Sequence, residues 1–228
     1  MVPVNKNFAQ NNKVFTGNTP CSINITKGTV ISIKHPLLFE PVLTVVQKTE
    51  GNNVFFRIPD TFLKYNIFKG DQITIQTLQD NYEYVIQGMI SDIELQYPRQ
   101  VQVSIDKVDR YKNKRKSKRY LTNLQANISS ADISRNLYAI VKNISDSGVS
   151  AVIREQLDTD SIVVMSICIP DNGLLEFKAK IIRNTRKANY YEYGMEIIKI
   201  DEGNKSLLSK LIASLNKNEK EYISECLR

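Results

Sequence analysis

The sequence offers little of what an enzyme or a metalloprotein needs. Its one histidine, His35, precedes Pro36 in an expected turn and has no cysteine or carboxylate cluster beside it. No P-loop, GxSxG motif or spacing of metal ligands occurs in the chain. We therefore expect no enzymatic activity, no catalytic residues and no metal site, and we interpret His35 as a surface or turn residue.

Long apolar runs are also missing. No run approaches the roughly 18 residues that span a bilayer, and the polar N-terminus lacks the apolar core of a signal peptide. The three cysteines, Cys21, Cys168 and Cys226, lie far apart and form no CxxC pair. The sequence thus predicts a cytoplasmic protein with reduced, structural cysteines and no membrane insertion.

The first half of the chain has the pattern of short β-strands. These segments are rich in Val, Ile, Thr and aromatic residues and are separated by turn signals such as Lys69-Gly70-Asp71. The predicted strands are Ser22–Lys34 with a break at Gly28, Pro41–Lys48, Asn53–Ile58, Gln72–Leu78, Glu83–Leu95 and Gln100–Ile105. Several strands at this spacing favour a small barrel or sandwich.

The second half repeats this pattern and then changes. Its predicted strands are Leu121–Ser129, Leu137–Asn143, Val149–Arg154, Ser161–Ile169, Leu174–Arg183 and Tyr190–Ile200. Asn172 and Gly173 predict a hairpin turn between two of them. An apolar stripe at helical spacing predicts a C-terminal helix from about residue 204, with Asn204 or Ser206 as its cap. The stripe consists of Leu207, Leu208, Leu211, Ile212 and Leu215.

Positive charge is concentrated in one short stretch. Seven of the ten residues Arg110–Arg119 are basic and none is acidic, and we call this stretch the basic segment. The whole chain has 31 basic and 24 acidic residues, so the remainder, with 24 of each, is formally neutral. Such a local excess predicts a site for an anionic partner. A chain of 228 residues has room for two domains, and the basic segment is best interpreted as the linker between them.

Two motifs in and after the basic segment carry the functional prediction. Arg115 and Arg119 form an RxxxR motif, and Asn143, Ser145 and Gly148 form an NxSxxG motif at a strand-to-turn junction. Arginine makes bidentate hydrogen bonds to phosphate and guanine and stacks on bases. Asparagine and serine side chains suit a base edge or a phosphate, and glycine permits a sharp turn close to a ligand.

Each of these features also has an interpretation without a ligand. Asn143 and Ser145 can simply close a turn, and Gly194, in a later strand, can be a bulge glycine. A basic stretch is most often a solvated linker. Only the combination of the motifs favours a binding site.

In order and spacing, the two motifs resemble the signature of PilZ domains, the receptors for the bacterial second messenger cyclic di-GMP. The resemblance covers Arg110 to the C-terminus, and Tyr193–Ile198 is similar to the glycine-containing late strand of the PilZ barrel. The preceding half is similar to the N-terminal barrel of YcgR-like flagellar-brake proteins. The resemblance implies a mainly β chain: a YcgR-like barrel (1–109), the linker (110–119), and a PilZ barrel with a C-terminal helix (120–228).

The resemblance also implies a ligand, cyclic di-GMP, and its binding residues. Arg115 and Arg119 would wrap over the ligand, while Asn143, Ser145 and Gly148 would hold it from the barrel surface. Lys114, which precedes the first arginine, stands where PilZ proteins influence whether one ligand or a stacked pair is bound. The sequence leaves that stoichiometry open because Lys lacks the planar group of Arg.

We therefore predict a cyclic di-GMP effector, with no cofactor, in which the ligand changes the orientation of the two barrels. The resemblance makes components of the flagellar motor the expected protein partner, with recruitment to the flagellar basal body and control of motility. No DNA partner is expected. Oligomeric state and affinity cannot be predicted from this sequence.

Two other functions stay open. The basic segment can bind single-stranded RNA, with Tyr111 and Tyr120 as stacking platforms. The formally neutral barrels and the lack of an RNP-like or repeated aromatic pattern count against this function. A PilZ fold that has lost its ligand and acts only as an adaptor is the second alternative, which the intact motif residues disfavour.

Overall fold

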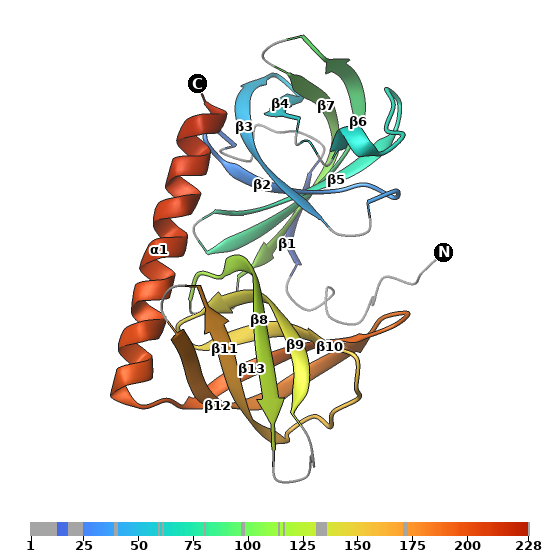
Figure 1. Cartoon of the computed structure of the whole chain (residues 1–228). Helices are drawn as coiled ribbons and strands as arrows, with labels where there is room; N and C mark the ends of the chain where they lie inside the picture. Colours follow the sequence, from blue (N-terminus) through green and yellow to red (C-terminus); the bar gives the residue numbers. More distant parts are fainter. Residues whose placement is uncertain are drawn as a thin grey trace. The chain divides into compact units, whose positions relative to one another are not determined.

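The computed structural model forms two compact units (Figure 1). Unit 1 comprises Met1–Lys114 together with Lys220–Arg228, and unit 2 comprises Arg115–Glu219. The chain therefore passes from one unit to the other twice. The structure describes residues 13–17, 25–38, 41–58, 60, 62–79, 81–96, 99–113, 115, 117–130, 136–170 and 173–227.

Unit 1 is a closed barrel of antiparallel strands with one further strand added. Strands β2 to β7 follow one another around the barrel in the order β7-β4-β3-β2-β5-β6, and β6 pairs with β7 to close it. Strand β1 pairs with β7. The elements are β1 (Lys13–Gly17), β2 (Val30–Lys34), β3 (Val42–Glu50), β4 (Asn53–Arg57), a 3-10 turn (Phe62–Lys64), β5 (Gln72–Gln79), β6 (Tyr82–Glu94) and β7 (Gln100–Lys112).

Alternation explains these strands, because every second side chain enters the core of the barrel. In β2, Ile31 and Ile33 are fully buried, and in β5 Ile73 and Ile75 are almost so. Thr77 continues the inward row of β5, and its hydroxyl donates to the carbonyl oxygen of Val30 at 2.9 Å, so this buried polar group is satisfied.

Two strands of unit 1 differ from their predicted extents. Where the sequence predicts a two-part strand from Ser22 to Lys34, the described residues form only β2, and Ile25 is buried outside any strand. Strand β7 runs seven residues beyond the predicted end at Ile105. Consequently Arg110, Tyr111 and Lys112 are strand residues, and the Arg110 guanidinium lies 4.6 Å from the centre of the Tyr82 ring. The part of the basic segment outside strands begins at residue 113.

Of the two interpretations of His35, the surface residue was wrong because the side chain is buried, and the turn residue is confirmed because its carbonyl oxygen accepts the N–H of Leu38 at 2.9 Å. It is 3% exposed; its Nδ1 accepts a hydrogen bond from the backbone N–H of Leu37 at 3.2 Å, and its Nε2 lies 3.3 Å from a carboxylate oxygen of Asp71. Because Nδ1 accepts, the proton of the neutral ring is on Nε2 and points to Asp71. The same carboxylate accepts the N–H of Phe68 at 2.8 Å, so the histidine joins two turns of unit 1.

Unit 2 is a second closed antiparallel barrel, with the strand order β10-β13-β12-β11-β8-β9. Its core contains Ile144, Met165, Ile167, Ile181 and other residues that are almost inaccessible. The strands are β8 (Tyr120–Ser129), β9 (Leu137–Ser145), β10 (Gly148–Ile153), β11 (Ile162–Ile169), β12 (Gly173–Arg186) and β13 (Tyr191–Lys199). Strand β11 pairs with β12 up to Ile169 and Gly173, which confirms the predicted hairpin.

Tyr193 is the largest fully buried side chain in this core, and its polar end is satisfied. Its hydroxyl donates to the carbonyl oxygen of Glu155 at 3.0 Å and accepts the N–H of Leu157 at 2.7 Å. Burial raises the pKa of this phenol, so the neutral, donating form is favoured. The segment after β10 is thereby anchored to the middle of β13.

The C-terminal helix α1 (Glu202–Cys226) packs its predicted apolar stripe on the barrel of unit 2. Leu208 is buried, and Leu207, Leu211, Ile212 and Leu215 are partly buried against the same core. The cap is Asp201 rather than Asn204 or Ser206, since the Asp201 carboxylate accepts the N–H of Asn204 at 2.9 Å. The Asn204 side chain instead accepts the N–H of Glu176 in β12 at 2.7 Å.

The last residues of α1 belong to unit 1. The hydroxyl of Tyr222 lies 3.4 Å from the carbonyl oxygen of Leu43, and Arg57 donates to the carbonyl oxygen of Glu225 at 3.3 Å. Cys226 is 3% exposed. The prediction of a mainly β chain with two barrels and a C-terminal helix is thus confirmed. Among the described helices, none is both long and apolar enough to cross a membrane.

Candidate ligand site on the C-terminal barrel

The two arginines of the RxxxR motif lie in the irregular segment that enters strand β8. Both side chains are exposed, and Arg119 directly precedes the first residue of the strand, Tyr120. Lys114, the remaining predicted site residue of this segment, lies outside the described residues. Backbone irregularity leaves these long cationic side chains outside the barrel, where a ligand can reach them.

Like charges surround Arg119. Burial lowers the pKa of its guanidinium, and the charges of Arg115 and Arg183 lower it further. The sequence analysis had not selected Arg183, which comes from strand β12. The positive charges of Arg115 and Arg183 repel that of Arg119. An anion bound among the three arginines would relieve this repulsion.

The NxSxxG motif spans the turn between β9 and β10. Ser145 is 2% exposed, and its hydroxyl donates to the carbonyl oxygen of Gly148 at 3.1 Å. A Cβ atom at Gly148 would overlap with the carbonyl oxygen of Met195 in β13. Ser145 therefore closes the turn, and the glycine permits close pairing of two strands without a positive φ. Both residues have a structural role here, whatever they add to a ligand site.

Asn143 is different. Its side-chain oxygen is inaccessible to solvent and has no hydrogen-bond partner within the described part of the chain. An inaccessible acceptor without a partner costs roughly 1–3 kcal/mol. Native proteins rarely keep such a group, and they keep it more often where a ligand supplies the missing donor.

Strand pairing places Asn143 in a row of residues across the outside of the barrel. The row consists of paired residues from five strands, and we call it the outer row. Each member is the Cα partner of the next: Leu121 in β8, Asn143 in β9, Ser150 in β10, Gly194 in β13 and Arg183 in β12. Cross-strand partners share one face of a sheet. The row therefore connects the start of β8, just after Arg119, to Arg183.

Three bulges put these residues on the outer face. The pairing register shifts in β8 after Leu121, in β9 next to Asn143, and in β12 just before Arg183. Without its bulge, Arg183 would share the inward face of Ile181, and Asn143 that of Val141. The site thus depends on irregularities that simple alternation does not reveal, and this explains why the sequence analysis missed Arg183.

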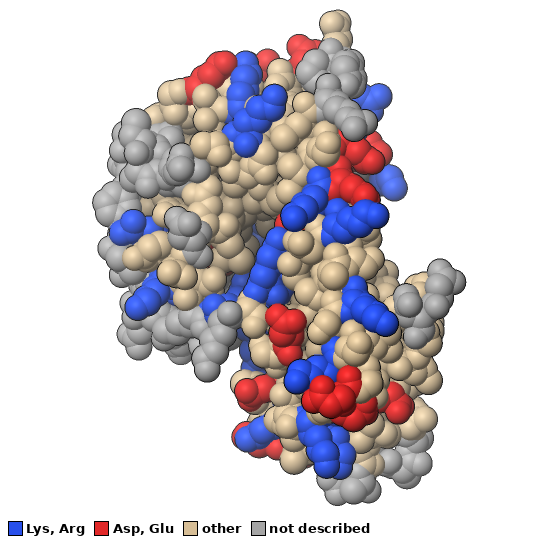
Figure 2. Space-filling model, turned by 90° about the vertical axis from the view of Figure 1, so that its left-hand side faces the viewer, with Lys and Arg blue, Asp and Glu red and all other residues tan. Residues whose placement is uncertain are grey.

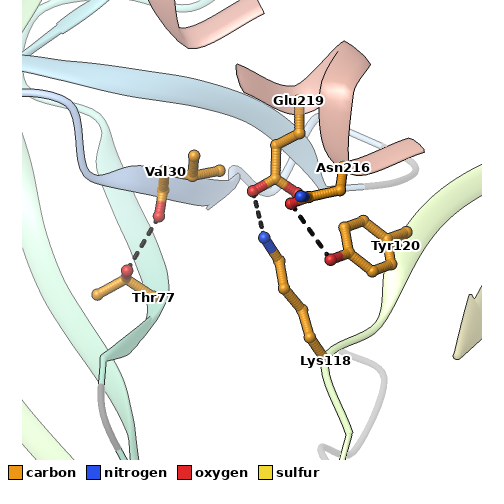
Figure 3. Close-up of polar contacts among 6 residues, drawn as sticks. All are labelled: Val30, Thr77, Lys118, Tyr120, Asn216 and Glu219. Atoms are coloured by element: carbon orange, nitrogen blue, oxygen red, sulfur yellow. Dashed lines mark hydrogen bonds and ion pairs between the residues drawn. The ribbon is translucent and has the colours of Figure 1, made fainter. Parts of the chain in front are cut away.

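Two contacts attach the end of the basic segment to helix α1 (Figure 3). The Lys118 ammonium lies 2.6 Å from a carboxylate oxygen of Glu219, and the Tyr120 hydroxyl lies 3.3 Å from the side-chain oxygen of Asn216. The Lys118 ammonium also lies 4.8 Å from the centre of the Tyr120 ring. The Lys118 side chain is therefore paired with helix α1, whereas Arg115 and Arg119 contribute to the positive cluster.

Basic and acidic side chains both occur on the face of the molecule that Figure 2 shows. Lys180 pairs with Asp160 at 2.8 Å, for example. No group of histidine, cysteine and carboxylate side chains that could hold a metal ion occurs among the described residues. Cys168 is an exposed thiol, Cys226 is a buried one, and Cys21 lies outside the described residues.

The fold defines a two-barrel protein, and the second barrel carries three neighbouring arginines and the inaccessible oxygen of Asn143. Residues 113–214 match the family model described as PilZ domain. This part of the chain is a PilZ domain, which confirms the resemblance inferred from the motifs. The match includes Arg115, Arg119, Asn143, Ser145 and Gly148.

Solved structures share this architecture at low sequence identity. MrkH of K. pneumonia in complex with c-di-GMP is 12% identical, with 85% of this chain and 89% of that chain covered and a TM-score of 0.51. The Bacillus subtilis inhibitor of motility MotI/DgrA is 15% identical (85% and 98% covered, TM-score 0.44). YcgR of Escherichia coli in complex with c-di-GMP is 12% identical (87% and 88% covered, TM-score 0.46).

These likenesses concern the fold alone. A further solved structure is that of MrkH, described as a c-di-GMP-dependent transcription regulatory factor, at 13% identity (82% and 84% covered, TM-score 0.47). No curated protein matches the sequence.

Proposed function

We propose that the chain is a cyclic di-GMP effector that acts by binding rather than by catalysis. The observation that supports this most is the positive cluster of Arg115, Arg119 and Arg183 at one end of an outer row that contains Asn143, all within a PilZ domain. Cyclic di-GMP carries two phosphate charges and two guanine bases. It therefore offers both the anion and the hydrogen-bond donors that this surface requires.

Each predicted site residue has a role in this proposal. Arg115 and Arg119 bind phosphate oxygens or the O6 and N7 edge of guanine, and their planes stack on the bases. Asn143 accepts an N–H of a guanine with the oxygen that is otherwise unsatisfied. Ser145 and Gly148 shape the turn that presents Asn143, and Lys114 adds long-range attraction.

The output follows from the position of the arginines. They lie at the first of the two passages of the chain between the units, so a ligand that fixes them orders the connecting segment. We propose that this changes the orientation of the barrels and thereby a surface for a partner. X-ray scattering with and without saturating ligand tests this step, and identical profiles would contradict it.

For the partner we propose a component of the flagellar motor, reached by recruitment to the flagellar basal body from the cytoplasm. The resemblance of the first half of the sequence to YcgR-like flagellar-brake proteins motivates this choice. A deletion strain tests it: its motility should no longer fall when cyclic di-GMP is raised. A normal fall in motility, together with altered transcription, would favour an output like that of MrkH instead.

The binding experiment is isothermal titration calorimetry of the full chain with cyclic di-GMP. We expect saturable binding, a stoichiometry that decides between one ligand and two, and at least about a 100-fold loss of affinity in Arg115→Ala and Arg119→Ala. Arg154→Ala, an exposed arginine after β10, is the matched control and should bind like wild type.

A function in binding single-stranded RNA predicts a different result in the same calorimetry experiment. Oligouridylate would then bind with a steep dependence on salt, and cyclic di-GMP would release no heat. Absence of binding by well-folded wild type would contradict the proposed function and leave the adaptor alternative.

A further inference from the structure

Arg183 occupies an unusual position in strand β12. The register shifts between Ile181 and Arg183, so Ile182 is the extra residue of a bulge, and Arg183 becomes the Cα partner of Gly194. Ile181 remains fully buried in the core, whereas Arg183 is exposed. The bulge thus places a long cationic side chain on the outer face at the end of the outer row.

The Arg183 side chain lies directly over Gly194. A Cβ atom at position 194 would lie 2.8 Å from its Nε, 2.9 Å from its Cγ and 3.3 Å from its Cδ. Any side chain at position 194 would meet the Arg183 side chain. Glycine is therefore required for the arginine to lie this close to β13. Because β13 separates β12 from β10, an arginine that crosses Gly194 points along the row towards Ser150 and Asn143.

The rest of the row suits a planar, anionic ligand. Ser150 is inaccessible, and its hydroxyl lies 3.4 Å from a carboxylate oxygen of Glu192, so it does not project into the space beside Gly194. Leu121, at the far end, is 57% exposed and offers an apolar surface on which a base can lie. Arg183 and Leu121 thus flank the inaccessible acceptor of Asn143 from opposite ends.

We propose that Arg183 is a third ligand-binding arginine, which contacts a phosphate of the bound nucleotide, and that Gly194 is a positioning residue that lets Arg183 lie across the barrel. This proposal rests on the proposed function and adds to it a contact outside both sequence motifs. The proximity of the Arg183 charge to Arg119 is consistent with it, since both guanidinium groups would then face the same anion.

Calorimetry with cyclic di-GMP on the full chain tests the role of Arg183. In Arg183→Ala we expect the Kd to rise by about 10–100-fold, the range for a lost charge-assisted hydrogen bond. The Kd should also depend less on ionic strength, a change that a merely structural role would not cause. The matched control is Arg186→Ala, which removes an exposed arginine from the same strand and should leave the Kd unchanged.

A double-mutant cycle tests the role of Gly194. The three atoms nearest to its hypothetical Cβ all belong to the Arg183 side chain, so Gly194→Ala displaces that side chain first. We expect about a tenfold rise in Kd in the wild-type background and none in the Arg183→Ala background. An equal rise in both backgrounds, or no rise in either, would overturn the positioning role.

The outcomes separate this inference from the proposed function. Binding by wild type with an unchanged Kd in Arg183→Ala overturns the third arginine and leaves the receptor proposal intact. Failure of wild type to bind contradicts the proposed function itself. Thermal unfolding of each variant confirms that a change in Kd does not come from loss of the fold.

Discussion

The two barrels share a closed, six-stranded antiparallel design, but one polar site in each, His35 with Asp71 in unit 1 and Asn143 in unit 2, differs in how its inaccessible groups are satisfied. In unit 1, His35 and Asp71 are neighbours, and each accepts a further backbone N–H. In unit 2, the oxygen of Asn143 has no partner within the described residues, and Arg119 lies near two other guanidinium charges. The first arrangement is complete in itself, whereas under the proposed function an anion with hydrogen-bond donors completes the second.

This difference separates structural from functional polar residues more clearly than residue type does. A histidine beside an aspartate would draw attention in any search for a catalytic site, yet its contacts account for its burial. An asparagine at the edge of a turn would not, yet its inaccessible side-chain oxygen has no hydrogen-bond partner among the residues that the structure describes. Substitutions in the two units should therefore have opposite consequences for stability and for binding.

The largest effect on stability is expected at the pair of His35 and Asp71. His35→Ala removes the acceptor for Leu37, the donor to Asp71 and the buried ring, so the free energy of unfolding of unit 1 should fall by about 2–3 kcal/mol. Hydrogen exchange of unit 1 amides in denaturant measures this loss. The affinity for cyclic di-GMP should stay within about twofold of wild type. Lys34→Ala, at an exposed neighbour, controls for local disturbance.

The opposite result is expected for Asn143→Ala. The Kd for cyclic di-GMP should rise by about 10–100-fold, because the side-chain oxygen of Asn143 is lost as an acceptor. The free energy of unfolding should change by less than about 1 kcal/mol, since the variant no longer buries an unsatisfied oxygen. Calorimetry and urea denaturation measure the two quantities, with Asn127→Ala on β8 as the exposed control. A large loss of stability would show that Asn143 has a structural role, and it would contradict the proposed difference between Asn143 and His35.

A pH effect on stability should appear at Tyr222 in unit 1. Burial and the neighbouring Cys226 raise the pKa of Tyr222 from 10.0 to about 12. A raised pKa means that the neutral phenol favours the folded state, so its contribution is complete below pH 10 and is lost between pH 10 and 12. At 39% exposure the side chain is partly screened, and we expect a loss of about 1 kcal/mol.

Tyr222→Phe should remove this part of the pH dependence. The measurement is the difference between the unfolding free energies of wild type and variant from pH 9 to 12, which cancels the titration of other groups. A difference that does not change with pH would mean that the phenol is solvated in the folded protein.

The smallest effect is expected at the surface contact of Figure 3. Lys118→Ala breaks an exposed ion pair with Glu219 and should change the unfolding free energy by less than about 1 kcal/mol. The Kd should rise less than about threefold, because the lysine is engaged by the helix and not by the arginine cluster. A loss as large as that in Arg119→Ala would show that attachment of the segment to α1 is itself part of the binding site.

Alternation of apolar residues was sufficient to predict most strands of both barrels, the hairpin at Gly173 and the stripe of helix α1. Long-range partners were not predictable in this way. The cap moved to Asp201 because Asn204 is recruited by the backbone of β12, a contact between residues 28 positions apart. His35 was misjudged because its partner Asp71 lies in another turn.

The candidate site shows the same limit. Its two sequence motifs were visible as spacing, but Arg183 and Leu121 join it only through strand register, which three bulges alter. Each bulge adds one residue to a strand and so moves every later side chain to the opposite face of the sheet. No distinctive sequence marks these bulges, so the alternation pattern does not reveal the change. The roles of Ser145 and Gly148 in the turn and strand contact likewise became evident only from neighbours in space.

The membership of Lys220–Arg228 in unit 1 has a consequence for synthesis on the ribosome. The first barrel is translated before Arg115, but the residues that complete it, including Tyr222 and Cys226, are translated only after all of unit 2. At about 5–20 residues per second, the nascent first barrel waits on the order of ten seconds for its final segment. During that interval the surface that later covers Cys226 is exposed to chaperones and to other nascent chains. The N-terminal barrel is thus finished only after the whole of unit 2 has been translated.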